Sequence, residues 1–370
     1  MIAALGLVLL THSYFDRESI VKRSCLLLSV LFFALNCLAQ TSDPSPSLVA
    51  KTPEEMTQLL GDAFQRNALS ALTGSYHLLA SFETFTRDGK PDGEGSIERW
   101  ATSSQRMKTI SRFRGHVMTE YVADGKALYT DDGFSGSIMT YFVDEFLFHP
   151  FAPPPSSGLY RRDLQTHPMQ LQGAELDCGT YQFYGEPPNS PFPTPPKEVL
   201  CVSRDTHDLI LQQTLIFSIR YKEFAPFKDR SISRYVSASQ GSVVRCRIHI
   251  QQLDETSLDD ASFIAPADAS PANPAPNWYS TSPAEAAAIH FPPVLGRIYP
   301  NGSTIHAAPV RTLVLRSRSG SVQEVEPITP MAPDLAQQAI DRAMQYKFPP
   351  LIRNGKPVET LFTVEFFITK

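Results

Sequence analysis

The sequence predicts an α+β protein, in which a large antiparallel β domain precedes a small module of one helix and a few strands. Between residues 74 and 258, apolar and polar residues alternate over long runs that end in Gly, Asp and Pro. This period of two is typical of half-buried antiparallel strands. Within residues 331–370, an amphipathic segment is followed by a Pro-Pro stop, an Asn-Gly turn and one alternating strand. Hydrophobic residues make up 42% of the 370 residues, enough for both parts to bury a core.

The N-terminal region, residues 1–39, has the pattern of a signal peptide. Lys22 and Arg23 form a basic region, the run from Leu26 to Leu35 is apolar, and Cys37-Leu38-Ala39 places small residues where a signal peptidase cleaves. The uncharged run is shorter than the roughly 20 residues that a membrane-spanning helix needs. Cleavage is therefore favoured over a short retained anchor. A further apolar run lies upstream of the basic pair, and a start site placed too far upstream would explain it.

A tether at residues 40–52 leads into the β domain, which we place at residues 53–263. Its first element is a predicted helix from Pro53 to Leu72, because Glu54 and Glu55 favour the positive end of a helix dipole and an apolar stripe follows. The run from Ile138 to Phe148 interrupts the alternation of the strands. We expect it to form a helix lying over the sheet.

A linker is predicted at residues 264–289, which are rich in Ala, Pro and Ser and contain no basic residue. Trp278 and Tyr279 are unusual in such a segment and are candidates for docking on one of the domains. The C-terminal module then spans residues 290–370. The net charge of −5 argues against nucleic acid as a partner.

Two of the cysteines are candidates for a disulfide. Cys178 and Cys201 lie in strand-like segments on either side of a Pro-rich connection. In an oxidising compartment they could bridge adjacent strands, and two buried thiols are the alternative. Cys246 is then left over and is expected to be a buried apolar side chain. The sequence contains no Cys-x-x-Cys pair, so it predicts neither a zinc ribbon nor a redox motif.

The C-terminal module carries a series of elements in a characteristic order. A strand at Val310–Leu315 is followed by a Gly-Ser turn, a second strand, a helix at Asp334–Tyr346, a Phe-Pro pair and an Asn-Gly-x-Pro-Val turn. The residues of the last two groups are Phe348, Pro349, Asn354, Gly355, Pro357 and Val358. This order resembles the C-terminal domain of TonB-type energy transducers. The resemblance implies a two-layer α+β domain whose strands can receive a strand from a partner.

Strand addition requires a free sheet edge. The last strand, around Phe362 to Ile368, or the strand at 310–315 would offer unpaired backbone groups if it lay at an edge. The alternative is a covered edge and a domain that only packs. A short apolar N-terminal segment and a brief linker favour a binding module over an energy transducer, which needs a membrane helix and a long arm.

The large domain resembles the LolA-like family of periplasmic lipoprotein carriers. The resemblance rests on the leading helix, the long strands with Asp-Gly turns, the lid-like apolar helix and the ending Leu-Asp-Asp-x-x-Phe at 258–263. It implies a curved antiparallel half-barrel, covered by helices, whose interior can hold acyl chains. The candidate cavity residues are Phe82, Phe85, Trp100, Tyr121, Tyr129, Tyr141, Phe142 and Phe146. The alternative is that these aromatic side chains fill a core.

Patterns for catalysis, a metal or a cofactor are absent from the sequence. The histidines do not have metal-ligand spacing, and neither His-Glu-x-x-His nor Gly-x-Ser-x-Gly occurs. We interpret 205–208 and 131–133, which are rich in Asp, as turns. The sequence therefore predicts a non-enzymatic periplasmic protein that binds lipid or lipoprotein acyl chains and an envelope protein. The alternative is a transducer or scaffold anchored in the inner membrane and acting on outer-membrane transport.

Overall fold

The computed structural model describes residues 49–103, 105–149, 161–184, 197–214, 216–279, 309–328 and 332–367. Residues 50–370 form one compact unit. The predicted signal peptide, most of the tether and residues 280–308 lie outside the described residues. No helix in the described ranges has both the length and the apolar character needed to cross a bilayer.

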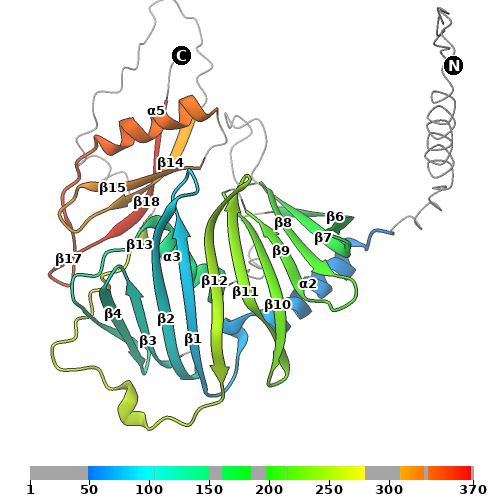
Figure 1. Ribbon diagram of the computed structural model, residues 1–370, viewed down its shortest axis with the longest axis horizontal. Helices are drawn as coiled ribbons and strands as arrows, with labels where there is room; N and C mark the ends of the chain where they lie inside the picture. Colours follow the sequence, from blue (N-terminus) through cyan, green and yellow to red (C-terminus); the bar gives the residue numbers. More distant parts are fainter. Residues whose placement is uncertain are drawn as a thin grey trace, which may run out of the picture. The chain divides into compact units, whose positions relative to one another are not determined.

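A twelve-stranded antiparallel sheet forms the β domain, in the order β5-β4-β3-β2-β1-β12-β11-β10-β9-β8-β7-β6 (Figure 1). All neighbours in the sheet are adjacent in sequence except β1 and β12, so β5 and β6 are its edges. The strands are β1 Tyr76–Phe85, β2 Pro91–Ser103, β3 Arg106–Phe113, β4 His116–Ala123, β5 Lys126–Asp131, β6 Arg161–Leu171, β7 Ala174–Tyr184, β8 Lys197–Ser203, β9 Leu209–Gln213, β10 Ser218–Phe227, β11 Arg230–Gln240 and β12 Val243–Asp254. The predicted antiparallel class is confirmed, as an open curved sheet.

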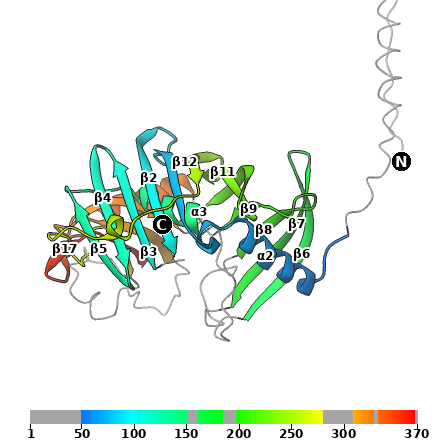
Figure 2. The same cartoon turned by 90° about the horizontal axis from the view of Figure 1, so that it is seen from below.

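Two helices, α2 (Pro53–Asn67) and α3 (Ile138–Phe148), pack on the same face of this sheet within one hydrophobic core (Figure 2). Helix α3 has the predicted bounds. Helix α2 ends earlier than predicted, and the short helix η1 (Leu69–Ala71) follows it. The buried Asn67 side chain explains this end, because its amide donates to Asp208 Oδ1 at 2.9 Å and its Oδ1 accepts from the backbone N–H of Leu209. Asn67 thereby connects the helix end to the start of β9.

The described part of the predicted linker is paired with both sheets. Ser270 and Tyr129 exchange two backbone hydrogen bonds, of 2.7 and 2.8 Å, at the outer side of edge strand β5. The strand β13 (Asn277–Tyr279) then pairs in parallel with residues 360–362 of β18. Trp278 and Tyr279 therefore dock through their backbone. Residues 264–279 connect the two sheets along a fixed path.

The C-terminal part contains a four-stranded sheet in the order β13-β18-β14-β15, with helix α5 (Pro333–Met344) against it. The other strands of this sheet are β14 Pro309–Arg316, β15 Val322–Pro327 and β18 Thr360–Phe367. The strand predicted at 310–315 is β14, and it lies between β18 and β15. Both of its sides are paired, so this strand is not an edge that could receive a partner's strand. The described pairing also occupies residues 360–362 of β18 on both sides.

The predicted Asn-Gly turn forms a small hairpin between β16 (Leu351–Arg353) and β17 (Lys356–Val358). Asn354 and Gly355 have φ values of 46° and 79°. Positive φ at both central residues is the geometry that selects Asn-Gly in a two-residue hairpin turn.

Both faces of the C-terminal sheet are covered. On one face, Val314 and Phe362 pack with Ala339 and Ala343 of α5. On the other face, Leu313, Leu315 and Leu361 pack against Ile138 at the start of α3. Figure 1 shows this sheet stacked at the ends of β1 and β2. Helix α3 is therefore a shared element between the β domain and the C-terminal part.

The predicted disulfide between Cys178 and Cys201 is confirmed. The two residues are directly opposite each other on β7 and β8, with Cα atoms 4.1 Å apart. Cys246 is a free thiol and is fully buried.

Removing this disulfide should lower the free energy of unfolding. The bridge closes a loop with a sequence separation of 23, and loop-closure entropy for a loop of this size is worth about 3 kcal/mol. We expect Cys178→Ala/Cys201→Ala to unfold at lower guanidinium concentration than the oxidised wild type. The wild type in reductant is the control and should lose a similar amount, while the double variant should not respond to reductant. A double variant as stable as the oxidised wild type would contradict a stabilising role.

Candidate cavity site

A cavity of about 330 Å³ lies beside α3 against strands β1 to β4. Its sheet wall includes Phe82, Ile97, Met107 and Met118. A second wall is formed by α3 and by Phe134 in the loop before it, and residues 273–276 form a third. The third wall follows from the pairing of Ser270 with β5, which directs the chain across this end of the sheet.

The strand alternation selects which side chains reach the cavity. Along β3 the lining residues are Met107, Thr109 and Ser111, and along β4 they are Met118 and Glu120. Each set is spaced by two residues, because successive side chains of a strand point to opposite faces. The same face of these strands therefore presents both apolar and polar side chains to the cavity.

Arg99 lines the cavity and is only 8% exposed. Its Nε donates to Thr109 Oγ1 at 2.9 Å, and its Nη2 donates to Asp144 Oδ1 at 3.0 Å. The guanidinium also lies over the ring of Phe148, 3.4 Å from the ring centroid. Arg99 thus joins β2 and β3 to helix α3 by charge-assisted contacts.

A second polar pair lies on β4 and β5. The hydroxyl of Tyr129 donates to Glu120 Oε1 at 2.9 Å. Burial raises the pKa of the Glu120 carboxyl, because desolvation opposes its charged form. Burial and the neighbouring Glu120 charge raise the pKa of Tyr129 as well. With Asp144 and Glu145 also lining the cavity, acidic side chains outnumber the single arginine.

Three of the eight predicted cavity aromatics, Phe82, Tyr129 and Tyr141, line this cavity. Phe142 and Phe146 stack on each other with centroids 5.6 Å apart, and both meet Phe217 edge-on. They fill the core between α3 and the chain before β10, as the alternative interpretation of these residues proposed.

The remaining three predicted aromatics lie outside the cavity. Trp100 stacks on His77 with centroids 4.7 Å apart, and the Lys108 ammonium lies 5.8 Å from the Trp100 ring and 5.4 Å from the Tyr121 ring. These residues occupy the opposite face of the sheet, since Trp100 and Tyr121 are each one residue from the cavity residues Arg99 and Glu120. Phe85 lies beside Arg247, 4.9 Å from its guanidinium.

Residue-type reasoning alone missed Arg99, Glu120, Met107 and Met118. The signal that could have found them is the phase of the alternation: if Phe82 faces inward, its strand partners in register define the same face on β2, β3 and β4.

The residues of the predicted Phe-Pro and Asn-Gly-x-Pro-Val motifs do not line this cavity. Phe348 packs edge-on against Phe362 at 5.0 Å between centroids, and the exposed Pro349 accepts a hydrogen bond at its carbonyl from Arg316. Asn354 and Gly355 form the hairpin turn described above. Pro357 and Val358 line a neighbouring pocket of about 280 Å³, which shares Tyr129 with the cavity.

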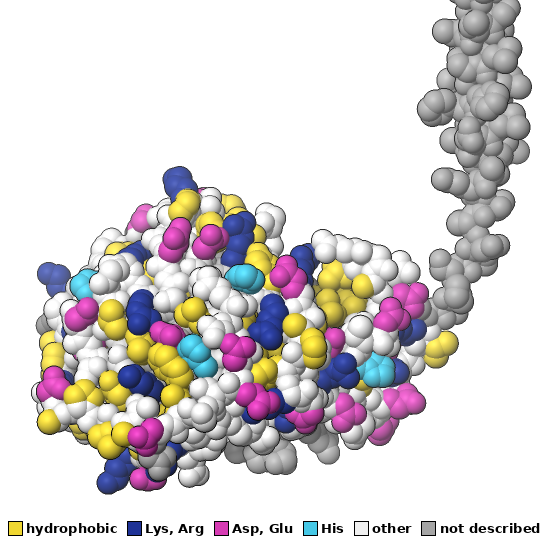
Figure 3. Space-filling model, turned by 60° about the horizontal axis from the view of Figure 1, so that its bottom comes forward, with side chains coloured by type: hydrophobic (Ala, Val, Ile, Leu, Met, Phe, Trp, Pro, Cys, Tyr) yellow, Lys and Arg dark blue, Asp and Glu magenta, His cyan; other side chains and the backbone are white. Residues whose placement is uncertain are grey.

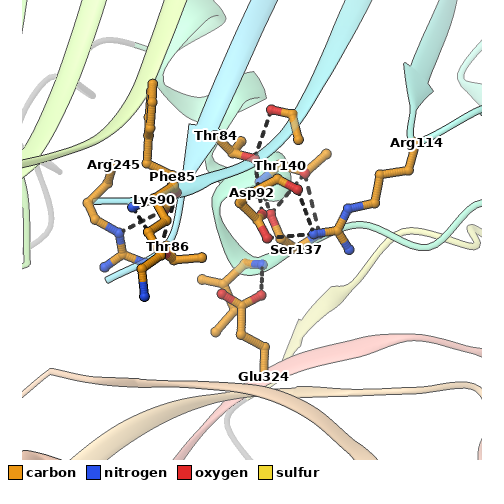
Figure 4. Close-up of polar contacts among 12 residues, drawn as sticks. Thr84, Phe85, Thr86, Lys90, Asp92, Arg114, Ser137, Thr140, Arg245 and Glu324 are labelled. Atoms are coloured by element: carbon orange, nitrogen blue, oxygen red, sulfur yellow. Dashed lines mark hydrogen bonds and ion pairs between the residues drawn. The ribbon is translucent and has the colours of Figure 1, made fainter. Parts of the chain in front are cut away.

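The C-terminal sheet contacts the same wall that α3 gives to the cavity. Glu324 of β15 accepts the backbone N–H of Ile138, the first residue of α3, at 2.6 Å (Figure 4). Glu359 accepts hydrogen bonds from Ser135 at 2.6 Å and from the hydroxyl of Tyr141. These acceptors come from β15 and from the residue directly before β18.

Arg318 adds a contact from the turn between β14 and β15. It donates to Asp131 Oδ1 at 2.8 Å and to the carbonyl of Phe134 at 2.7 Å. Phe134 lines the cavity, so the loop before α3 is held from the C-terminal side too.

A buried ion pair joins the two sheets directly. Arg245 of β12 and Glu326 of β15 lie 2.8 Å apart, each side chain 2% exposed. Gln240 contacts both partners. Arg245 Nε also donates to the carbonyl of Phe85 at 3.1 Å (Figure 4). These additional bonds satisfy the two buried charged groups.

Within the described ranges, no group of His, Cys, Asp and Glu is arranged to hold a metal ion. The 205–208 segment lies at a turn whose buried Asp208 is bound by Arg66 and Asn67.

Figure 3 shows acidic and basic side chains interspersed over one face of the molecule. That face has no concentration of positive charge of the kind that binds nucleic acid.

Comparison with known proteins gives structural similarity only. No protein-family model and no curated protein matches the chain. Among solved structures, it is similar to a proposed outer-membrane lipoprotein-sorting protein domain from Vibrio parahaemolyticus (10% identity, 57% of this chain and 97% of that one). It is also similar to a LolA superfamily protein from Nitrosomonas europaea (11%, 56% and 96%) and to a DUF1329 family protein from Desulfovibrio piger (12%, 57% and 96%). The TM-score is 0.36 in each case, so the function is argued from the cavity.

The burial of Glu324 should make stability depend on pH. Burial raises the pKa of Glu324 to about 7, although the N–H of Ile138 partly offsets this effect. Because this value lies above the roughly 4.3 of an unfolded glutamate, the folded state binds more protons between these values. The contribution of Glu324 to the free energy of unfolding should therefore fall by roughly 3 kcal/mol as pH rises from about 4 to 8.

The variant Glu324→Gln isolates this contribution, since its amide oxygen can still accept the N–H of Ile138. Urea denaturation of both proteins from pH 5 to pH 8.5 should show the variant gaining stability relative to the wild type as pH rises. A difference between the two proteins that does not change with pH would contradict the raised pKa.

Proposed function

We propose that this protein is a non-enzymatic carrier of the cell envelope, which holds the apolar chain of a lipid or lipoprotein in the cavity beside α3. The observation that carries the proposal is the cavity itself, where apolar side chains and a row of polar groups on the sheet line a space beside a helix. The predicted signal peptide supports a periplasmic location. A volume of about 330 Å³ is near the lower end of the roughly 300–1,000 Å³ typical of ligand pockets, which favours a single chain.

The polar residues that line the cavity favour a head group that donates hydrogen bonds or carries positive charge. The Arg99 guanidinium is already engaged by Thr109 and Asp144. Glu120 accepts the Tyr129 hydroxyl at Oε1, and a carboxylate with two oxygens has room to accept a further hydrogen bond. An anionic head would instead meet an excess of carboxylates in a partly desolvated space, where like charges repel more strongly than in water.

The proposal of a non-enzymatic role rests on how these polar groups are used. Arg99 and Asp144 connect the sheet to α3, and Tyr129 with Glu120 connects β5 to β4. Such contacts hold the cavity walls in place, and neither pair presents an activated nucleophile to a ligand.

Filling the cavity should abolish binding. The variant Met118→Trp enlarges a side chain that lines the cavity, whereas Val117→Trp places the same ring on the opposite face of β4. In a fluorescence titration with a dodecyl chain carrying a dansyl amide, we expect Met118→Trp to bind at least about tenfold more weakly than wild type. Val117→Trp should remain within about twofold. Equal affinities for the two variants would remove the cavity as the binding site.

Head-group preference is tested by competition with three ligands of equal chain length. Dodecylamine and dodecanol should displace the dansyl probe at lower concentration than dodecanoate at pH 8, because the cavity carries excess acidic groups. Extraction of the purified protein followed by mass spectrometry provides a second measurement. A protein that neither co-purifies with an amphiphile nor binds any of the three would refute the proposed carrier function.

A further inference from the structure

The wall that closes the cavity is held from outside by the C-terminal sheet. Tyr141 places its ring in the cavity and donates its hydroxyl to Glu359. Phe134 also lines the cavity, and its carbonyl accepts from Arg318. A ligand in the cavity would therefore contact the same two residues that Glu359 and Arg318 hold.

The first turn of α3 is held in the same way. Glu324 accepts the N–H of Ile138, which lies at the positive end of the helix dipole, where a carboxylate is favourable. Gln323 donates to Ser135 at 3.2 Å, in the loop that precedes the helix. The side chain of Ile138 is fully buried among leucines of β14 and β18. The position of α3 over the cavity thus depends on the C-terminal sheet as well as on the large sheet.

The attachment of the C-terminal sheet to the large sheet is separate from these contacts. The Arg245–Glu326 pair, with Gln240, joins β15 to β11 and β12 and does not involve α3. The strand β13 connects the C-terminal sheet to residues that pair with β5. The C-terminal sheet therefore has attachments that do not pass through α3.

We propose that the C-terminal sheet is a latch on the cavity: Glu359 and Glu324 position Tyr141 and the start of α3, and ligand exchange requires these contacts to open. The latch regulates the site of the proposed carrier function and in that respect rests on it. Glu359 and Glu324 are positioning residues, since neither lines the cavity. Their effect should appear in the rate of exchange more than in the affinity.

The test uses the full chain with conservative variants. Tyr141→Phe keeps the ring in the cavity wall and removes the hydroxyl that Glu359 accepts, and Glu359→Gln removes the charge of the acceptor. Tyr235→Phe, on β11 and away from the cavity residues, is the matched control. Near-UV circular dichroism of each variant confirms that the fold is kept.

Release of the dansyl-dodecyl probe is followed in a stopped-flow experiment by mixing the loaded protein with excess phosphatidylcholine vesicles. A hydrogen bond to a charged group contributes enough that its loss should speed release by roughly tenfold or more. We expect Tyr141→Phe and Glu359→Gln to accelerate both release and uptake, with a smaller change in Kd. The double variant should be no faster than the faster single variant, since both changes weaken the same contact between Tyr141 and Glu359. Tyr235→Phe should match the wild type.

Amide hydrogen exchange without ligand separates the latch from the carrier function. Amides of residues 138–148 should exchange faster in Tyr141→Phe and Glu359→Gln than in the wild type and Tyr235→Phe. If the wild type binds no amphiphile but these amides respond, the carrier function fails and the structural latch stands. If the probe binds and both variants leave release rates and amide exchange unchanged, the latch is refuted and the carrier function stands.

Discussion

The structure depends on the burial of helix α3 on more than one side. Its residues Ile138, Met139, Val143, Leu147 and Phe148 are at most 4% exposed. A helix that is apolar around most of its circumference cannot lie on the surface of one sheet and must be covered again. The large sheet covers one side, and Leu313, Leu315 and Leu361 of the C-terminal sheet contact its N-terminal end. This requirement explains why the C-terminal part packs into the same compact unit.

Burial of the start of α3 creates a need for hydrogen-bond acceptors, because the first N–H groups of a helix have no partners within it. Ser137 and Thr140 form a capping box in which each side chain accepts the backbone N–H of the other residue, and Glu324 accepts the N–H of Ile138. The acidic residues of β15 therefore have distinct structural roles. Glu326 forms an ion pair with Arg245 of the large sheet, and Glu324 accepts a hydrogen bond from the first residue of the helix.

The Arg245–Glu326 pair fixes how the two sheets meet more than it strengthens their contact. Removing two charges from water costs several kcal/mol per ion, and their attraction repays it only with good geometry and further hydrogen bonds. Here Gln240 and the Phe85 carbonyl supply those bonds. A displaced docking of the C-terminal sheet would leave Arg245 buried without its partner. The pair thus penalises alternative arrangements.

Local patterns in the sequence predicted the elements better than the contacts between them. The run Ile138–Phe148 was predicted with its correct bounds because its apolar residues do not alternate with polar ones as they would in a half-buried strand. The disulfide followed from two strand-like segments around a Pro-rich connection. The cavity was predicted less well, since an aromatic residue type does not show which face of the sheet the side chain points to. Trp100 and Tyr121 were chosen for their rings, while their neighbours Arg99 and Glu120 line the cavity.

The paths of residues 264–279 and of β14 could not be predicted for a different reason. A composition rich in Ala and Pro describes a chain without its own secondary structure, but it carries no information about an outside backbone that can pair with it. Ser270 pairs with the backbone of β5, and residues 277–279 pair with the backbone of β18. Likewise, the alternation of β14 predicts a strand but does not say which strands flank it.

Under the proposed function, the shared wall couples ligand binding in the cavity to the contacts that the wall makes with the C-terminal sheet. Tyr141 and Phe134 contact the cavity on one side and Glu359 and Arg318 on the other. A ligand that binds more tightly when the wall is closed stabilises the contacts between the wall and the C-terminal sheet. Coupling is reciprocal, so those contacts stabilise ligand binding by the same free energy. A partner that pulled on the C-terminal sheet would then favour release. Attachment through Arg245 and Glu326 would keep that sheet in place to close the wall again.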